Sequence, residues 1–172
     1  NFEVIKDTAQ QGSVFDEIPL QFILKANDGG LNEVIGAFNE NYNRFIYENA
    51  NRIYKSRDKK LVNDFRNAMI GQYSKVSDPY FTDYIDYTLA SLNWVSATMS
   101  SEQIISNYFS GRKILYHNIQ YTDFFAEFFK AYFGSSNACT YLEIKNAINA
   151  ATNYNSLDAV IKRDSLLVDE QL

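Results

Sequence analysis

The chain has 172 residues and a net charge of −5, with 46% hydrophobic and 16% aromatic residues. This length and composition predict a folded protein with a substantial core dominated by phenylalanine and tyrosine rings. The acidic balance argues against nucleic acid as a partner, because phosphate binding needs a broad basic surface. No apolar run approaches the roughly 20 residues that a membrane-spanning helix requires.

The first 26 residues predict an extended segment rather than a helix. Two short runs rich in β-branched and aromatic residues, at 2–6 and 20–25, flank a polar loop, and Pro19 breaks any helix there. We interpret residues 1–26 as an extended leader or as the remnant of a β domain upstream.

The run Asn27-Asp28-Gly29-Gly30 is the strongest turn signal of the chain, and the hydrophobic period becomes helical after it. We therefore predict a boundary here and a helical domain over residues 27–172. The chain starts at Asn1 rather than at a methionine, and its last apolar residues lack a helix stop. From these ends we expect a fragment of a longer protein.

Three helices are predicted in the first half of this domain from apolar residues at 3-4-7 spacing. The first covers residues 31–54, and a shorter one follows the polar corner at residues 56–58. The third, about residues 79–98, opens on the start signal Asp78-Pro79. It is apolar nearly all round, which predicts a central position among other helices.

The second half is predicted to contain shorter helices. Ser100 and Gln103 form a capping box whose helix ends at Gly111, and residues 114–119 predict an extended connection laid over the core. Thr122-Asp123 is the predicted start of a phenylalanine-rich helix that ends at Gly134.

A further capping box, Thr140 to Glu143, opens a helix that residues 153–155 should break, and Ser156 is the predicted cap of the last one. Together these signals predict an all-α fold, an irregular multi-helix bundle with a short extended N-terminal segment.

His117 is the only histidine and the natural starting point for a search for catalysis. Its neighbours Tyr116 and Asn118 supply neither the orienting carboxylate nor the nucleophile of a triad, which favours a hydrogen-bonded structural role. The single cysteine, Cys139, excludes a C-x-x-C pair, and one histidine with one cysteine cannot complete a zinc site without carboxylates. We therefore predict no catalytic, cofactor-binding or metal-binding residues; a hydrolase centred on His117 is the second alternative.

A sugar-binding platform is the first alternative. Tyr80, Tyr87 and Trp94 recur at intervals of seven along one line of the third helix, although contact with a neighbouring helix explains such a column as well. With Tyr116, His117 and Asn118 they make up the candidate interaction surface.

Two stretches of aromatic pattern carry a family resemblance. Residues 108–118, followed by the paired phenylalanines to Phe129, and residues 79–92 resemble the helical region that precedes the thioredoxin-like domain in thiol-disulfide oxidoreductase proteins of Bacteroidetes-type cell envelopes. The resemblance covers about residues 31–167. It implies a periplasmic or cell-envelope location and a parent protein with a C-terminal C-x-x-C domain.

This chain has no such pair, so the resemblance transfers no redox residue to it. The leading hypothesis is a non-catalytic helical accessory or interaction domain whose partner is a neighbouring domain of the same polypeptide.

Overall fold

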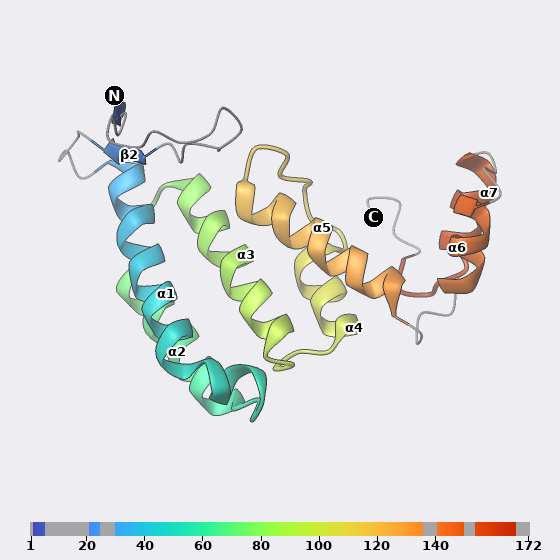
Figure 1. Ribbon diagram of the computed structural model, residues 1–172, viewed down its shortest axis with the longest axis horizontal. Helices are drawn as coiled ribbons and strands as arrows, with labels where there is room; N and C mark the ends of the chain where they lie inside the picture. The colour runs from blue at the N-terminus through green and yellow to red at the C-terminus, as the bar shows by residue number, and fades with distance from the viewer. Residues whose placement is uncertain (1, 6–20, 25–29, 136–140, 150–153, 168–172) are drawn as a thin grey trace, which may run out of the picture. The chain divides into compact units, whose positions relative to one another are not determined.

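The computed structural model describes residues 2–5, 21–24, 30–135, 141–149 and 154–167 (Figure 1). The chain divides into two compact units, residues 1–43 and 44–172. The boundary predicted after residue 26 stays a prediction, and the polar loop predicted before Pro19 lies outside the described residues. The predicted all-α fold with a short extended N-terminal segment is confirmed.

In the first unit, two short strands form an antiparallel pair. β1 (Phe2–Ile5) lies beside β2 (Gln21–Leu24), with Phe2 opposite Leu24. The helix α1 (Leu31–Tyr54) starts in this unit, and the carbonyl of Gly30 accepts hydrogen bonds from its first free amides. The bounds of α1 are those expected from the apolar spacing.

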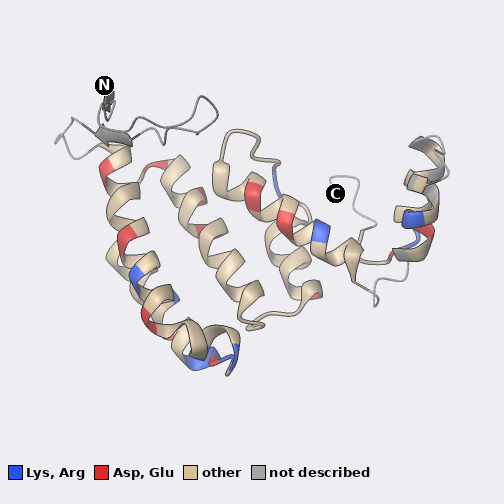
Figure 2. Cartoon of the chain, in the orientation of Figure 1, with Lys and Arg blue, Asp and Glu red and all other residues tan. Residues whose placement is uncertain are grey.

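In the second unit, α2 (Lys59–Gln72) follows the end of α1 after a tight turn. The Asp58 carboxylate accepts a hydrogen bond of 3.0 Å from the backbone N–H of Leu61 and so caps α2. The rings of Phe45 and Phe65 stack with their centroids 3.8 Å apart, which holds the last turns of α1 against α2. Both signs of charge gather around this turn (Figure 2).

The third helix, α3 (Pro79–Val95), occupies the central position that its apolar surface predicts. It contacts α2, α4 and α5, and Figure 1 shows it running beside α5. Asp78 caps it by accepting from the backbone N–H of Phe81 at 3.0 Å. The helix ends at Val95, three residues before the predicted end, and Ala97 in the following turn takes a positive φ of 52°.

The capping box at Ser100 is confirmed, since both of its reciprocal hydrogen bonds form. The helix it opens is in two parts, α4 (Ser101–Ile104) and then a π-helical turn, η1 (Ile105–Phe109), which the sequence did not predict. The Tyr87 hydroxyl donates a hydrogen bond of 2.9 Å to the carbonyl of Tyr108, which ties η1 to α3. Gly111 ends the segment with a φ of 66°, where a side chain would be strained.

The phenylalanine-rich helix α5 (Ile119–Gly134) begins three residues earlier than predicted. Asn118 rather than Thr122 provides the cap, because its side-chain oxygen accepts from the backbone N–H of Tyr121 at 3.2 Å. The Thr122 hydroxyl lies within the first turn instead and donates to the carbonyl of Ile119.

The aromatic side chains of α5 form the main core ridge. The ring of Phe109 lies at its centre. Its centroid is between 5.2 Å and 5.6 Å from the ring centroids of four α5 phenylalanines: Phe124, Phe125, Phe128 and Phe129. Edge-to-face and tilted pairs of this kind add to the free energy gained from burial alone. The dense aromatic run therefore packs the protein's interior.

Two short helices complete the described residues, α6 (Tyr141–Asn149) and α7 (Tyr154–Ile161). The predicted cap at Ser156 is wrong, because α7 starts two residues before it. Serine is a weak helix former, but it is tolerated in the first turn of α7, because the backbone amides of a first turn have no intrahelical acceptor. Thr140, the other predicted cap, lies outside the described residues. Within the described part of the chain, no helix combines the length and apolar character needed to cross a membrane.

Candidate binding groove

A groove of about 460 Å³ opens between the end of α2 and the first half of α3. Its size is within the range of small-ligand and peptide sites. Six of the side chains that line it are apolar or aromatic: Ile70, Tyr73, Val76, Phe81, Ile85 and Leu89. The groove lies wholly within the second unit.

The ends of two helices shape the groove. Tyr73 caps the C-terminus of α2, and the chain turns back through Val76 to the start of α3 at Asp78-Pro79. The ring of Tyr73 meets the edge of Phe81 with centroids 5.3 Å apart. Ile70 stays 45% exposed beside them, so apolar surface is left open at the mouth of the groove.

Arg112 closes one side of the groove from a different segment. Its guanidinium lies 3.1 Å from a carboxylate oxygen of Asp86 and 5.7 Å from the centre of the Tyr108 ring. The left-handed turn at Gly111 precedes this arginine. From there residues 112–118, which we call the strap, lead to Asn118, whose side-chain amide donates to the carbonyl of Tyr80 at 3.2 Å.

Asp83 is the other acidic residue of the groove, one turn before Asp86 on α3. It makes no hydrogen bond or ion pair with any described residue. Burial raises the pKa of Asp83 above its ordinary value, repulsion from Asp86 raises that pKa further, and Arg112 lowers it in part. The carboxylate therefore carries a charge that its surroundings do not fully compensate.

The predicted aromatic column on α3 does not form one exposed platform. Tyr87 is only 2% exposed, and burial raises the pKa of its hydroxyl to about 12, so that it acts as a neutral donor. Tyr80 is half-buried near the strap. Trp94 is half-buried, with its ring against those of Phe124 and Phe128. Contact with α5 therefore accounts for the burial of Tyr87 and Trp94.

The three remaining candidate residues lie at the end of the strap, and they differ in exposure. Tyr116 is 73% exposed and His117 is exposed beside it in a turn. Asn118 is 4% exposed, because its side chain both caps α5 and binds the carbonyl of Tyr80, so it belongs to the interior and not to an interaction surface. His117 forms no hydrogen bond with any described residue, and the hydrogen-bonded structural role expected for it stays a prediction.

Sequence reasoning missed the three charged groove residues. None of the three, Asp83, Asp86 and Arg112, belongs to a sequence motif that points to a site. The available signal was their placement, because two carboxylates three residues apart lie on one face of a helix that is otherwise apolar nearly all round.

A second pocket, of about 390 Å³, lies between α3, α4 and α5 and the C-terminal segment. Trp94 and Phe128 line its apolar side, and Ser101 and Ser135 are among its polar lining. The hydroxyl of Tyr132, also in this pocket, donates to Asp164 at 2.7 Å. Across the described residues, no three histidine, cysteine or acidic side chains lie close enough to hold a metal ion.

Comparison of the chain with protein-family models, with curated proteins and with solved structures finds no match.

Proposed function

We propose that the chain is a non-catalytic helical accessory domain of a cell-envelope protein, which holds a neighbouring domain of the same polypeptide through the α2–α3 groove. The observation that carries this proposal is the groove itself, a largely apolar hollow of about 460 Å³ built on the ends of two packed helices. An apolar surface with a few convergent polar groups suits the docking of a chain segment.

The core supports the same proposal. Side chains of α3, η1 and α5 interlock around Phe109, so α3 is a rigid base on which the groove residues are held in fixed positions. The resemblance of residues 108–133 to helical regions next to thioredoxin-like domains supports an envelope protein whose neighbouring domain is a thiol-disulfide module.

The natural coding sequence beyond Leu172 gives the first test. We expect it to continue into a strand-rich domain with a C-x-x-C pair, and a stop codon directly after Leu172 would count heavily against the proposal. The neighbouring domain, produced separately, should then be titrated into the isotope-labelled chain while backbone amide shifts are followed by NMR. We expect shifts to concentrate at groove residues such as Ile70, Tyr73 and Arg112.

A matched pair of variants makes this titration specific. Ile70→Lys places a charge in the apolar mouth of the groove and should abolish the interaction. Leu142→Lys changes an apolar side chain that is 67% exposed on α6, away from the groove lining, and should leave it intact. Binding that survives Ile70→Lys, or that both variants weaken equally, would contradict docking in the groove.

A carbohydrate site at the second pocket is the alternative function that a specific observation favours. Trp94 lines this pocket beside Ser101 and Ser135, and an aromatic ring next to hydroxyl groups is a common surface for sugars. We expect binding on a glycan array to be lost in Trp94→Ala and kept in Tyr80→Ala. No signal above background from the wild-type chain removes this alternative.

The hydrolase hypothesis has an equally direct test. His117 is exposed, so His117→Ala should leave the melting temperature nearly unchanged. Loss of a measured hydrolytic activity in that variant would favour a catalytic role over the accessory role proposed here.

A further inference from the structure

The groove contains three charged side chains, and two of them already satisfy each other. Arg112 pairs with Asp86 at 3.1 Å and lies over the ring of Tyr108, so its charge is engaged from two sides. Asp83 has no such partner among the described residues. The unmatched charge of the groove is therefore negative.

The surroundings of Asp83 increase the need for a counter-charge. Apolar side chains of α2 and α3 line the groove around it, and a segment that docks there would remove water from the carboxylate. A neutral segment would leave Asp83 both unpaired and more deeply buried. An acidic segment would add repulsion from Asp83 and Asp86, whereas a basic group would offset the loss of water.

From this geometry we propose that the groove receives a peptide segment in which a lysine or arginine, flanked by apolar residues, pairs with Asp83. This inference rests on the proposed function and names the chemistry of the segment that docks. Ile70, Ile85 and Leu89 contact the apolar flanks, and the Arg112–Asp86 pair stays in place at the rim. The net charge of −5 of the whole chain acts in the same direction, because it attracts a basic partner at long range.

Three capped peptides test the inference on the intact chain of 172 residues. They share the sequence acetyl-Ala-Phe-X-Leu-Ala-amide, in which X is lysine, glutamine or glutamate. Each is titrated into the isotope-labelled protein at pH 7 and low salt, and the dissociation constant is taken from the shifts of groove amides. We expect the lysine peptide to bind about fivefold more tightly than the glutamine peptide, the size of one partly exposed ion pair. The glutamate peptide should bind most weakly.

Matched variants assign the preference to one carboxylate. Asp83→Asn should remove the preference for lysine over glutamine, while Asp123→Asn, an exposed aspartate that lines no part of this groove, should retain it. Added salt should reduce the preference in the wild type, because a partly exposed ion pair is screened. Acidification should begin to reduce it at a higher pH than for an ordinary aspartate, because the pKa of the unliganded Asp83 is raised, and should abolish it once Asp83 is protonated in the complex as well.

The remaining outcomes separate this inference from the proposed function. Equal binding of all three peptides in the groove, a preference for glutamate, or a lysine preference that persists in Asp83→Asn would overturn the inference and leave groove docking standing. If no peptide perturbs the groove, the inference falls as well, and docking is then decided by the titration with the neighbouring domain.

Discussion

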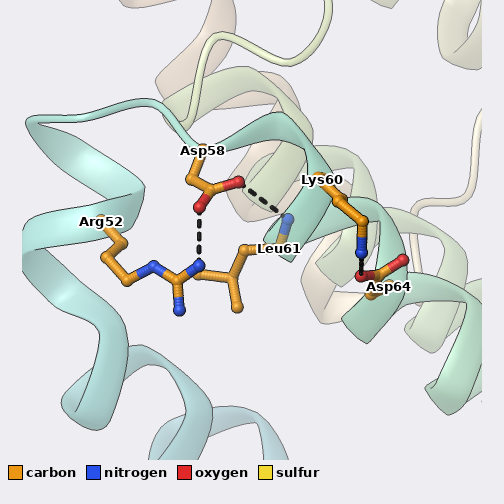
Figure 3. Close-up of polar contacts among 5 residues, drawn as sticks. All are labelled: Arg52, Asp58, Lys60, Leu61 and Asp64. Atoms are coloured by element: carbon orange, nitrogen blue, oxygen red, sulfur yellow. Dashed lines mark hydrogen bonds and ion pairs between the residues drawn. The ribbon is translucent and has the colours of Figure 1, made fainter.

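The turn between α1 and α2 and the groove between α2 and α3 are both rich in charge, yet their charges are arranged in opposite ways. At the turn, Asp58 accepts from Arg52 at 2.7 Å and from the backbone N–H of Leu61 at 3.0 Å, and Lys60 pairs with Asp64 at 2.7 Å (Figure 3). In the groove, Asp83 has no partner among the described residues.

The two aspartates consequently respond to folding with opposite signs. The hydrogen bond from Leu61, followed by that from Arg52, lowers the pKa of Asp58, whereas burial and Asp86 raise the pKa of Asp83. The ionised form of Asp58 therefore stabilises the native state, and the ionised form of Asp83 destabilises it. This contrast is the basis of the proposal that Asp83 pairs with a basic side chain in the groove.

The largest effect that can break this comparison is expected for Asp58→Ala. The substitution removes the cap of α2 and the partner of Arg52 together, so the melting temperature should fall by several degrees. The loss should be seen at pH 7 and should shrink as the pH falls through the lowered pKa of Asp58, because protonation removes the same interactions from the wild type. Asp58→Asn, which can still cap the helix, should lose less. Equal losses in both variants would mean that the charge, and not the cap, dominates.

Asp78→Ala isolates the capping effect at the start of α3, beside the groove. Asp78 caps α3 with the same geometry, a 3.0 Å bond from Phe81, but the structure shows no ion pair to it within the described residues. We expect a loss of about 1 kcal/mol in the free energy of unfolding, measured by urea denaturation. The Asp78→Ser variant should recover most of that loss, since serine is a good cap.

The parts of the fold that could be predicted from sequence are those set by local signals. The apolar spacing determined both ends of α1, and Asp78-Pro79 and the Ser100 capping box determined two helix starts. The predicted start of α5 was wrong because Asn118 and Thr122 are both residue types that cap helices well. A contact distant in sequence, from Asn118 to the carbonyl of Tyr80, favours the first. The π-helical turn likewise coincides with a long-range bond from Tyr87, which no local pattern reveals.

The candidate groove was less predictable than the fold. Arg112 and Asp86 are 26 residues apart, and they meet only because the strap returns along α3 after Gly111. An aromatic column such as Tyr80, Tyr87 and Trp94 reads the same in sequence whether it faces solvent or a neighbouring helix. Here the packing of α5 and η1 on α3 decides in favour of burial for Tyr87.

Asp83→Asn sharpens the comparison from the groove side, with a smaller effect of opposite sign. The native-state pKa of Asp83 is raised, so the native state holds this proton more tightly than the unfolded chain does. Ionisation at neutral pH therefore lowers stability, and removal of the charge should raise the free energy of unfolding by up to about 0.5 kcal/mol at pH 7. The gain should disappear as the pH falls below the unfolded-state value of about 4, where both states are protonated. A loss of stability at pH 7 would show that Asp83 has a stabilising partner after all.

Lys60→Ala should have the smallest effect, although its ion pair is as short as that of Asp58. Both Lys60 and Asp64 are largely exposed, and the lysine precedes the aspartate, the less favourable order for a pair four residues apart. Lys60 also lies in the first turn of α2, where the helix dipole disfavours a positive charge and offsets the attraction to Asp64. We therefore expect no change in the melting temperature beyond measurement error. A drop in melting temperature close to that of Asp58→Ala would mean that ion pairs, rather than the cap, stabilise this turn. The turn and the groove would then differ only in whether their charges are paired.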